Sequence, residues 1–162
     1  MKDLRQMSYE EFGKLRFLAF FPKTDDYFHD TIGCMELPNL AGLSCSEGNG
    51  LRSYFASPLD SNQTVSISLD FEEGCSETEG HALLQHIGLR ISKGMPYEQV
   101  KEILGQPTRD VFGAPTGGNS TELRYVFGAV SQFYVDCFIT EREGLSRVSI
   151  CRKDLADESD AW

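Results

Sequence analysis

Residues 91–110 read ISKGMPYEQVKEILGQPTRD, a short amphipathic segment with glycine and proline at both ends. Pro96 suits the first turn of a helix, because the amide that proline lacks would have no partner there. Gly105 suits the left-handed residue just past a helix end, and Pro107 prevents continuation. We therefore predict a helix of about two turns between Pro96 and Gly105.

The apolar side chains of this predicted helix recur at helical spacing. Tyr97, Val100, Ile103 and Leu104 fall on one face, and charged or amide side chains fall on the other. An isolated helix this short melts in water, so packing against another element must hold it. The residues that follow predict a sheet as that element.

Three segments with alternating polar and apolar residues follow the helix: Thr121–Val130, Ser131–Thr140 and Leu145–Cys151. Their short connections are typical of antiparallel neighbours. We interpret residues 87–152 as one helix plus a three-stranded antiparallel unit. The stretch before it, HALLQHIGLRIS, fits either a strand or a helical turn leading into a strand at Ile87–Ile91, and its pattern does not decide.

The N-terminal part, residues 1–86, is predicted to hold a helix and a β-hairpin. Ser8-Tyr9-Glu10-Glu11 has the form of a capping box, so a helix begins there and runs towards Pro22. Polar and apolar residues alternate with a period of two in LRSYFASP, from Leu51, and in Thr64–Phe71. This alternation predicts a hairpin with one solvent-exposed face.

Turn-forming residues dominate residues 23–50, where we expect loops and at most one strand, around Thr31–Glu36. The acidic tail, residues 153–162, is expected to fray.

The motif Gly94-Met95, Tyr97-Glu98, Ile103-Leu104-Gly105 and Pro107, followed by an aromatic first strand with Tyr125 and Phe127, resembles a known domain. It is shared by the small outer-membrane assembly lipoproteins of the SmpA/OmlA (BamE) type and by the β-lactamase inhibitory proteins. The likeness covers about residues 87–151. It implies an α+β fold in which short helices pack on one face of an antiparallel meander.

The inhibitory proteins carry two such units, and Leu51–Phe55 echoes Leu123–Phe127, so a degenerate tandem repeat is an alternative for this chain. Two features depart from the family. The chain has Pro96 where the family has threonine, and Cys45 lies mid-chain with no signal segment before it, so a lipoprotein role is not carried over.

The charge balance narrows the classes of partner. Twenty-five acidic residues against 15 basic ones give a formal net charge of -10, which disfavours nucleic acid because phosphate binding needs clustered cations. The apolar run LAFF near the N-terminus is too short for a signal core or a membrane span. Five cysteines with no C-x-x-C pair favour reduced thiols, so we expect a cytoplasmic protein.

Candidate chemical groups are sparse. Cys75, His81 and His86 could supply three metal ligands, but no fourth partner is evident and structural zinc sites show tighter pairs. Cys34 near His29 shows no orienting third group for nucleophilic catalysis. Asp25 and Asp26 are better read as surface residues of a turn, and Cys137 as a small core residue. We therefore predict no enzyme activity, no metal and no cofactor.

Aromatic side chains are the remaining feature of the sequence that suggests a function. Alternation along Ser131–Thr140 places Tyr134, Asp136 and Phe138 on the strand face opposite Phe133. If no other layer covers that face, these residues form an aromatic and acidic patch suited to a protein partner, and we include Tyr125 among the candidate partner-binding residues.

The sequence thus favours a non-enzymatic protein-binding module, similar to an inhibitor or immunity protein, that occludes a basic surface of its partner. The alternative is a small-ligand-binding protein or an enzyme that uses the concave face of the sheet and the loop 112–120. A homodimer is a third interpretation.

Overall fold

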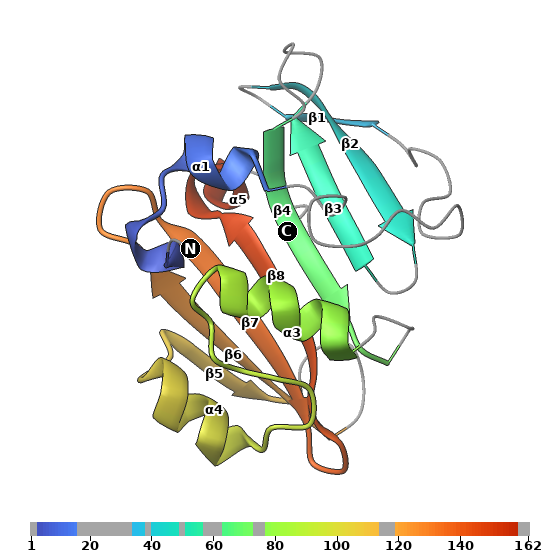
Figure 1. The fold of residues 1–162 in the computed structure, drawn as a ribbon, viewed down its shortest axis with the longest axis vertical. Helices are drawn as coiled ribbons and strands as arrows, with labels where there is room; N and C mark the ends of the chain where they lie inside the picture. Colours follow the sequence, from blue (N-terminus) through green and yellow to red (C-terminus); the bar gives the residue numbers. More distant parts are fainter. Residues whose placement is uncertain are drawn as a thin grey trace.

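The computed structural model describes residues 3–15, 34–37, 40–48, 51–56, 63–72, 77–113 and 119–158. Its strands form one antiparallel sheet in the order β1-β2-β3-β4-β8-β7-β6-β5 (Figure 1). In chain order the elements are η1 (Leu4–Gln6), α1 (Tyr9–Gly13), β1 (Cys34–Leu37), β2 (Leu40–Gly48), β3 (Leu51–Ala56), β4 (Gln63–Asp70), α3 (Glu77–His86), α4 (Tyr97–Leu104), β5 (Arg109–Phe112), β6 (Ser120–Phe127), β7 (Phe133–Thr140), β8 (Gly144–Arg152) and α5 (Lys153–Glu158).

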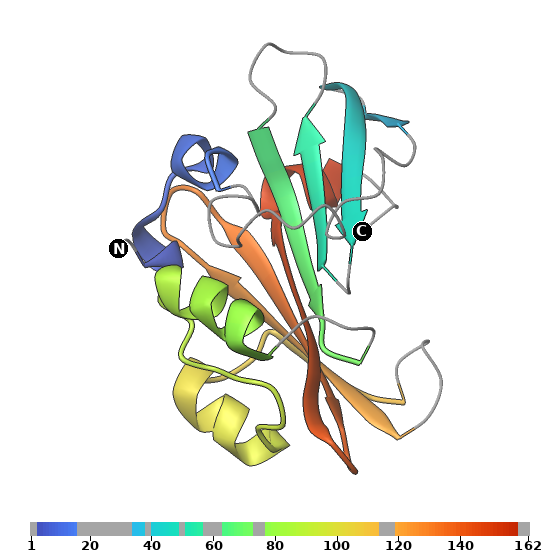
Figure 2. The ribbon, with the colours of Figure 1, turned by 45° about the vertical axis from the view of Figure 1, so that its right-hand side comes forward.

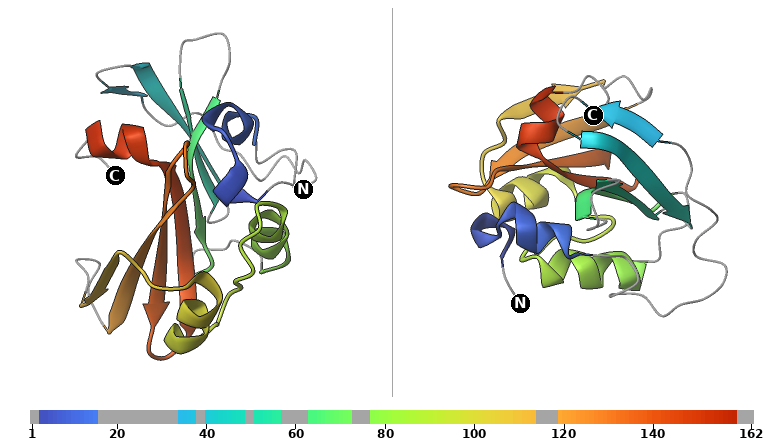
Figure 3. Two further views of the ribbon diagram at one scale, coloured as in Figure 1. Left: turned by 90° about the vertical axis from the view of Figure 1, so that its left-hand side faces the viewer. Right: turned by 90° about the horizontal axis from the view of Figure 1, so that it is seen from above.

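The helices divide between the two sides of this sheet. Helices α1, α3 and α4 lie on one side and α5 lies on the other (Figures 2 and 3). We call these sides the covered face and the far face. On β6, β7 and β8, the covered face carries the cross-strand row Leu123, Cys137 and Val148, and the far face carries the next row, Arg124, Asp136 and Ser149.

The hydrophobic core lies between the covered face and its helices. It includes Ile67 and Leu69 of β4 as well as residues of β6, β7 and β8, so both parts of the chain contribute to one core. Ile67 of β4 pairs with Ile150 of β8, which makes the sheet continuous between the β3–β4 hairpin and the C-terminal strands. Phe12 of α1 packs on Phe133 of β7 with ring centroids 4.9 Å apart.

The predicted helix and antiparallel strands are confirmed. Helix α4 buries Val100 and Leu104, and Pro96 is its N-cap residue without a side-chain hydrogen bond. Gly105 ends the helix with φ 89° and ψ -156°, so its φ is positive as predicted but it lies outside the left-handed helical region. The capping box at Ser8 is also present, with the Ser8 hydroxyl accepting from Glu11 N and the Glu11 carboxylate accepting from Ser8 N.

The prediction of a strand at Ile87–Ile91 is wrong. Helix α3 occupies the preceding residues and ends in a hydrogen-bonded turn. Gly88 has φ 80°, and the amides of Gly88 and Leu89 donate to the carbonyl oxygens of Gln85 and Leu84, at 3.0 and 2.8 Å. This is the Schellman arrangement, and it turns the chain out of the helix without continuing into a strand.

Three further expectations need correction. Strand β2 (Leu40–Gly48) lies where loops were expected, because it pairs with β1 on one side and β3 on the other. Strand β5 (Arg109–Phe112) was not predicted. Residues 153–158 of the expected frayed tail form α5, in which Leu155 is buried and Lys153 N donates to Gln132 O at 2.9 Å.

The first helix, expected to run towards Pro22, ends at Gly13, with Lys14 N donating to Glu11 O and Phe12 O. Residues 16–33 lie outside the described residues. The predicted strand around Thr31–Glu36 overlaps β1 (Cys34–Leu37) in part. In the part of the chain that the structure describes, no helix has the length and apolar character needed to cross a membrane.

Candidate partner-binding site

Asp136 lies on the far face, as alternation predicted, but its carboxylate is already paired. Arg124 Nε donates to Asp136 Oδ1 at 2.6 Å and Arg124 Nη2 donates to Asp136 Oδ2 at 2.8 Å. Asp136 is only 7% exposed, and its hydrogen bonds raise the pKa of the Arg124 guanidinium. A bidentate pair of this kind holds both charges within the sheet. Asp136 therefore offers little negative charge to a partner.

Tyr134 also has partners within the chain. Its hydroxyl donates to Asp157 Oδ1 of α5 at 2.7 Å, and the Arg124 guanidinium lies 4.5 Å from its ring centroid. The hydrogen bond to Asp157 raises the pKa of Tyr134, and Lys153 lowers the pKa of Asp157. Helix α5 thus covers the end of the far face that carries Tyr134.

Phe138 is half-buried on the same face and stacks with an arginine. The Arg147 guanidinium lies 4.0 Å from the Phe138 ring centroid, and Arg147 Nε is buried with no hydrogen-bond partner. A guanidinium over an aromatic face is attracted by the ring quadrupole. Phe138 thus stacks with an arginine of β8, whereas Tyr134 contacts α5 and Asp136 is paired with Arg124.

Tyr125 does not belong with the other three candidates. It pairs with Val135 across β6 and β7, which puts it on the covered face, and it is 1% exposed. Its ring stacks on Phe127 at 5.8 Å, and burial raises the pKa of its hydroxyl, which has no hydrogen-bond partner. Alternation decides the difference, because Tyr125 and Arg124 are adjacent on one strand.

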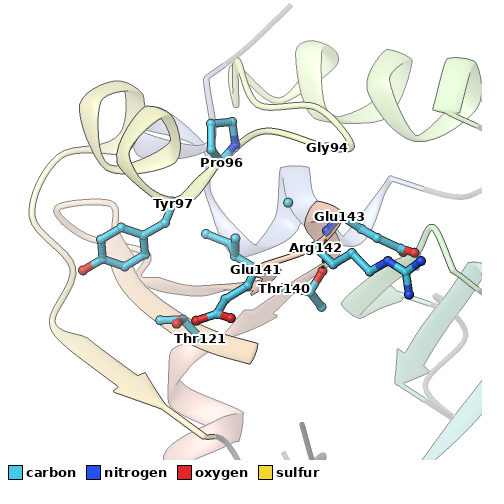
Figure 4. A pocket seen from close by; sticks show the side chains of 10 residues that line it. Gly94, Pro96, Tyr97, Thr121, Thr140, Glu141, Arg142 and Glu143 are labelled. Carbon is cyan, nitrogen blue, oxygen red and sulfur yellow. Dashed lines mark hydrogen bonds between the residues drawn. The ribbon is translucent and has the colours of Figure 1, made fainter. Parts of the chain in front are cut away.

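A pocket of about 500 Å³ lies at the opposite end of the sheet from α5, between the start of α4 and the β7–β8 turn (Figure 4). In Figure 4, Glu141 points to the side of the pocket where Tyr97 and Thr121 lie, and Arg142 points the other way. Its lining comprises Gly94, Pro96, Tyr97, Thr121, Ile139, Thr140, Glu141, Arg142, Glu143 and Gly144.

Two backbone hydrogen bonds hold the start of α4 at this pocket. Gly94 N donates to Leu145 O at 2.9 Å, and Leu145 N donates to Met95 O at 2.8 Å. Gly144 has φ 73°, and a Cβ there would lie 2.3 Å from Gly94 O. Glycine is thus required at position 144 for the two chain segments to approach this closely. The pocket is a consequence of that approach.

A second set of contacts joins α4 to the edge of the sheet. The Tyr97 hydroxyl donates to the Asp110 carboxylate of β5, and Lys101 Nζ donates to the Tyr97 hydroxyl at 2.9 Å. Lys101 Nζ also lies 3.6 Å from Asp110 Oδ2. Tyr97 therefore keeps a fixed position on the pocket wall, and the charge of Asp110 is balanced.

Phe112 lies next to a residue that lines the pocket, at the edge of the sheet. Thr121, which lines the pocket, pairs with Ile139 on one side and with Phe112 on the other. Phe112 is 64% exposed, which is unusual for a large apolar side chain. The sequence reasoning missed this residue, because a four-residue strand has too few alternations to be recognised.

Strand β4 ends, α3 and α4 begin and β7 turns into β8 towards the same end of the molecule (Figure 1). These segments and the rest of α4 carry exposed carboxylates. Lys93 and Arg142 are exposed nearby, so the local balance is acidic but not uniformly so. The exposed carboxylates on these segments are Glu72, Glu77, Glu98, Glu102, Glu141 and Glu143.

The candidate metal ligands are described only in part. Within the described ranges, no three His, Cys, Asp or Glu side chains are placed to hold a metal ion. His81 and His86 both lie on α3, whereas Cys75 falls outside the described residues, as do Asp25, Asp26 and His29. Cys34 begins β1, where the backbone alone is described.

Both thiols whose surroundings are described are buried. Cys137 is 0% exposed in the core, as predicted, and burial raises its pKa. Burial raises the pKa of Cys151, on the far face, to about 12. Neither is a thiolate at neutral pH, so neither is a nucleophile in the folded protein.

The comparisons with known proteins add no relative to this geometry. A scan against protein-family models and searches of the curated proteins and of the solved structures found no match to this chain.

Proposed function

We propose that this protein is a non-enzymatic binding module that occludes a basic surface of a partner protein, in the manner of an inhibitor or immunity protein. The observation that carries this proposal is the pocket end, where an apolar ring at Phe112 adjoins a pocket rimmed by Glu141 and Glu143. An exposed aromatic side chain beside a concave, charged rim is typical of a protein contact. The net charge of -10 steers a basic partner towards the chain.

We assign the principal contact to the pocket end rather than to the far face. Asp136 and Tyr134 are engaged by Arg124 and Asp157 within the chain, so a partner would have to displace those contacts. Phe138 with Arg147 remains a secondary candidate, because the Phe138 ring is half-buried and stacks with the Arg147 guanidinium.

The resemblance to the SmpA/OmlA-type and β-lactamase inhibitory domains supports an inhibitor-like role. The order of elements supports the resemblance, because the helix α4 precedes the antiparallel strands β6, β7 and β8. We extend the proposal to a degenerate tandem repeat, in which β3 corresponds to β6, on the echo between Leu51–Phe55 and Leu123–Phe127. A cytoplasmic setting is supported by the free thiols of Cys137 and Cys151.

The test is affinity capture from native lysate at low and high salt, with the wild-type chain and two charge variants. Glu141→Lys combined with Glu143→Lys reverses the charge of the pocket rim, and Glu10→Lys, at an exposed position of α1, reverses a charge away from the pocket. We expect a specific partner that is lost at high salt and lost with the rim variant, but retained by Glu10→Lys. No partner at either salt, or a partner indifferent to the rim variant, contradicts the proposal.

The alternative role, binding of a small ligand, is favoured by the pocket volume of about 500 Å³, which is typical of small-molecule sites. The loop 112–120, which we assigned to this alternative site, is described only at its ends, residues 112–113 and 119–120. A thermal-shift screen against metabolites tests this role, because a ligand at 100 times its Kd adds about 2.7 kcal/mol to the free energy of unfolding.

The third interpretation, a homodimer, is tested by light scattering, which measures the mass of the protein in solution.

A further inference from the structure

Strand β5 ends the sheet, and its outer side carries backbone groups without a strand partner in the described sheet. The order of strands places β5 last, paired with β6 alone. Gly113 N donates to Ser120 O at 2.9 Å, which fixes the direction of the neighbouring amides. Because amide direction alternates along an antiparallel strand, Val111 N faces β6, and Asp110 N and Phe112 N face outward. An edge of this kind is a template for another strand.

The covered side of this edge leads directly into the pocket. Phe112, Thr121 and Ile139 are cross-strand partners in one row on β5, β6 and β7. Thr121 and Ile139 line the pocket, and Phe112 is 64% exposed at the open end of the row. A strand added along β5 would place one of its side chains beside the Phe112 ring, where directly opposite Cβ atoms lie about 4.5–5.5 Å apart.

The charged side chains around the β5 edge indicate which charge a segment bound there should carry. Arg109, the one cation on β5, lies with Nη1 3.9 Å from Glu122 Oε1, so an acceptor already faces it. Lys101 is similarly taken up by Asp110 and Tyr97. The exposed Glu141 and Glu143 have no ion pair to a described cation within 4.0 Å. The surplus charge beside the edge is negative, which favours a basic segment.

We infer that the partner presents a basic, extended segment that pairs with β5 as a further strand of the sheet and sets an apolar side chain against Phe112. This inference rests on the proposed function and specifies its mode of contact. In such β-augmentation the main-chain hydrogen bonds supply affinity, and pockets for alternate side chains supply specificity. A second copy of the chain is disfavoured as the occupant, because pairing two β5 edges brings together two acidic ends of chains with a net charge of -10.

The probe for this inference is a synthetic ten-residue peptide of alternating lysine and valine. Two twins carry backbone N-methyl groups, one on every lysine and the other on every valine, so that each twin blocks one edge of the peptide. A strand-paired peptide uses one edge, so we expect the parent and one twin to bind and the other twin to bind at least about tenfold more weakly. We also expect slower hydrogen exchange at Asp110 N and Phe112 N when the parent peptide is bound.

Two substitutions at one position separate the ring from the backbone. Phe112→Ala removes the ring alone, whereas Phe112→Pro also removes an outward amide, and proline is tolerated where an edge amide faces solvent. We expect Phe112→Pro to bind the parent peptide about 3- to 10-fold more weakly than Phe112→Ala, the value of one net hydrogen bond. Val130→Ala, at a turn residue that is 95% exposed, should leave binding unchanged.

The outcomes distinguish the inference from the function on which it rests. If both twins bind as well as the parent, or the parent does not bind, strand pairing is wrong, while partner loss with the Glu141 and Glu143 reversal still supports the proposed function. If the chain alone forms a dimer that Phe112→Pro dissociates, a second copy occupies the edge and the inference is wrong. Protection of Asp110 N and Phe112 N by the parent peptide, together with failure of one twin, supports it.

Discussion

On the covered face of β6, β7 and β8, the row Leu123, Cys137 and Val148 is 0% exposed beneath helices. The adjacent row points to the far face, where Arg124 of β6 and Asp136 of β7 form an ion pair. The covered face is held by apolar burial, which acts without direction over its whole area. The far face is held by the Arg124–Asp136 pair and by the contact of Tyr134 with α5. The same strands thus stabilise the molecule by different means on their two sides.

The largest expected effect tests the covered face. Phe133 is 0% exposed and contacts the rings of Phe12 at 4.9 Å and Tyr9 at 5.3 Å, so Phe133→Ala leaves a cavity that joins α1 to β7. We expect a loss of about 3–5 kcal/mol in the free energy of unfolding, measured by urea titration. Phe138→Ala, on the same strand but half-buried on the far face, should cost about 1–2 kcal/mol. Equal losses would remove the distinction between the faces.

The second prediction tests the ion pair of the far face. Asp136→Ala leaves the partly buried Arg124 guanidinium without its bidentate partner, and we expect a loss of about 2–3 kcal/mol, below the value for a fully buried pair because Arg124 is 25% exposed. The double variant Arg124→Ala, Asp136→Ala should be less destabilised than the sum of the single variants. Additive losses in urea titrations would mean that the two side chains do not act as a pair.

The two faces also show what sequence reasoning can reach. Period-two alternation separated Phe133 from Phe138 correctly, and capping residues located α4, because both signals are local. Tyr125 was grouped with far-face residues although it lies on the covered face. An aromatic residue is common on either face, and the register with β7 was needed to assign it. Strand β2 is set by its pairing with β1 and β3, and β5 by its pairing with β6. The residues of β2 and β5 themselves carry little strand signal.

The candidate site could be predicted less well than the fold. Its pocket depends on the approach of Gly94 to Gly144, two residues whose proximity no local pattern encodes. Phe112 was assigned to a loop. Helix α5 was assigned to a frayed tail, because Leu155 becomes buried and Asp157 meets Tyr134 of β7 only in the folded chain.

The third prediction concerns buried thiols on both faces. The pKa of Cys137 is raised from 9.0 by burial, and that of Cys151 is raised to about 12. The folded state therefore holds these protons more tightly than the unfolded chain, so their contribution to stability is complete below pH 9 and is lost as the pH rises through the folded values. We expect the free energy of unfolding, measured by urea titration, to fall above pH 9, with a slope of up to about 1.4 kcal/mol per pH unit for each thiol.

Cys137→Ala should reduce this alkaline slope, measured against the slope of the wild type over the same pH range. A residual slope should remain, because burial also raises the pKa of Tyr125 from 10.0. In the folded protein near pH 8 neither thiol should react with iodoacetamide. Rapid alkylation of Cys137 would show that the covered face opens more readily than its burial indicates.

The smallest expected effect concerns α5, the one described helix on the far face. Tyr134→Phe removes the hydrogen bond to Asp157 Oδ1 and keeps the ring under the Arg124 guanidinium, so we expect a loss of about 0.5–1 kcal/mol. The loss should be local, with faster amide hydrogen exchange in residues 153–157 and little change in the covered core. Tyr97→Phe, which removes a hydroxyl bonded to Asp110 at the pocket end, is the matched control and should leave exchange in α5 unchanged. If exchange in α5 does not change in Tyr134→Phe, Leu155 and the backbone contact to Gln132 hold the helix, and the far face relies on apolar burial more than its polar rows suggest.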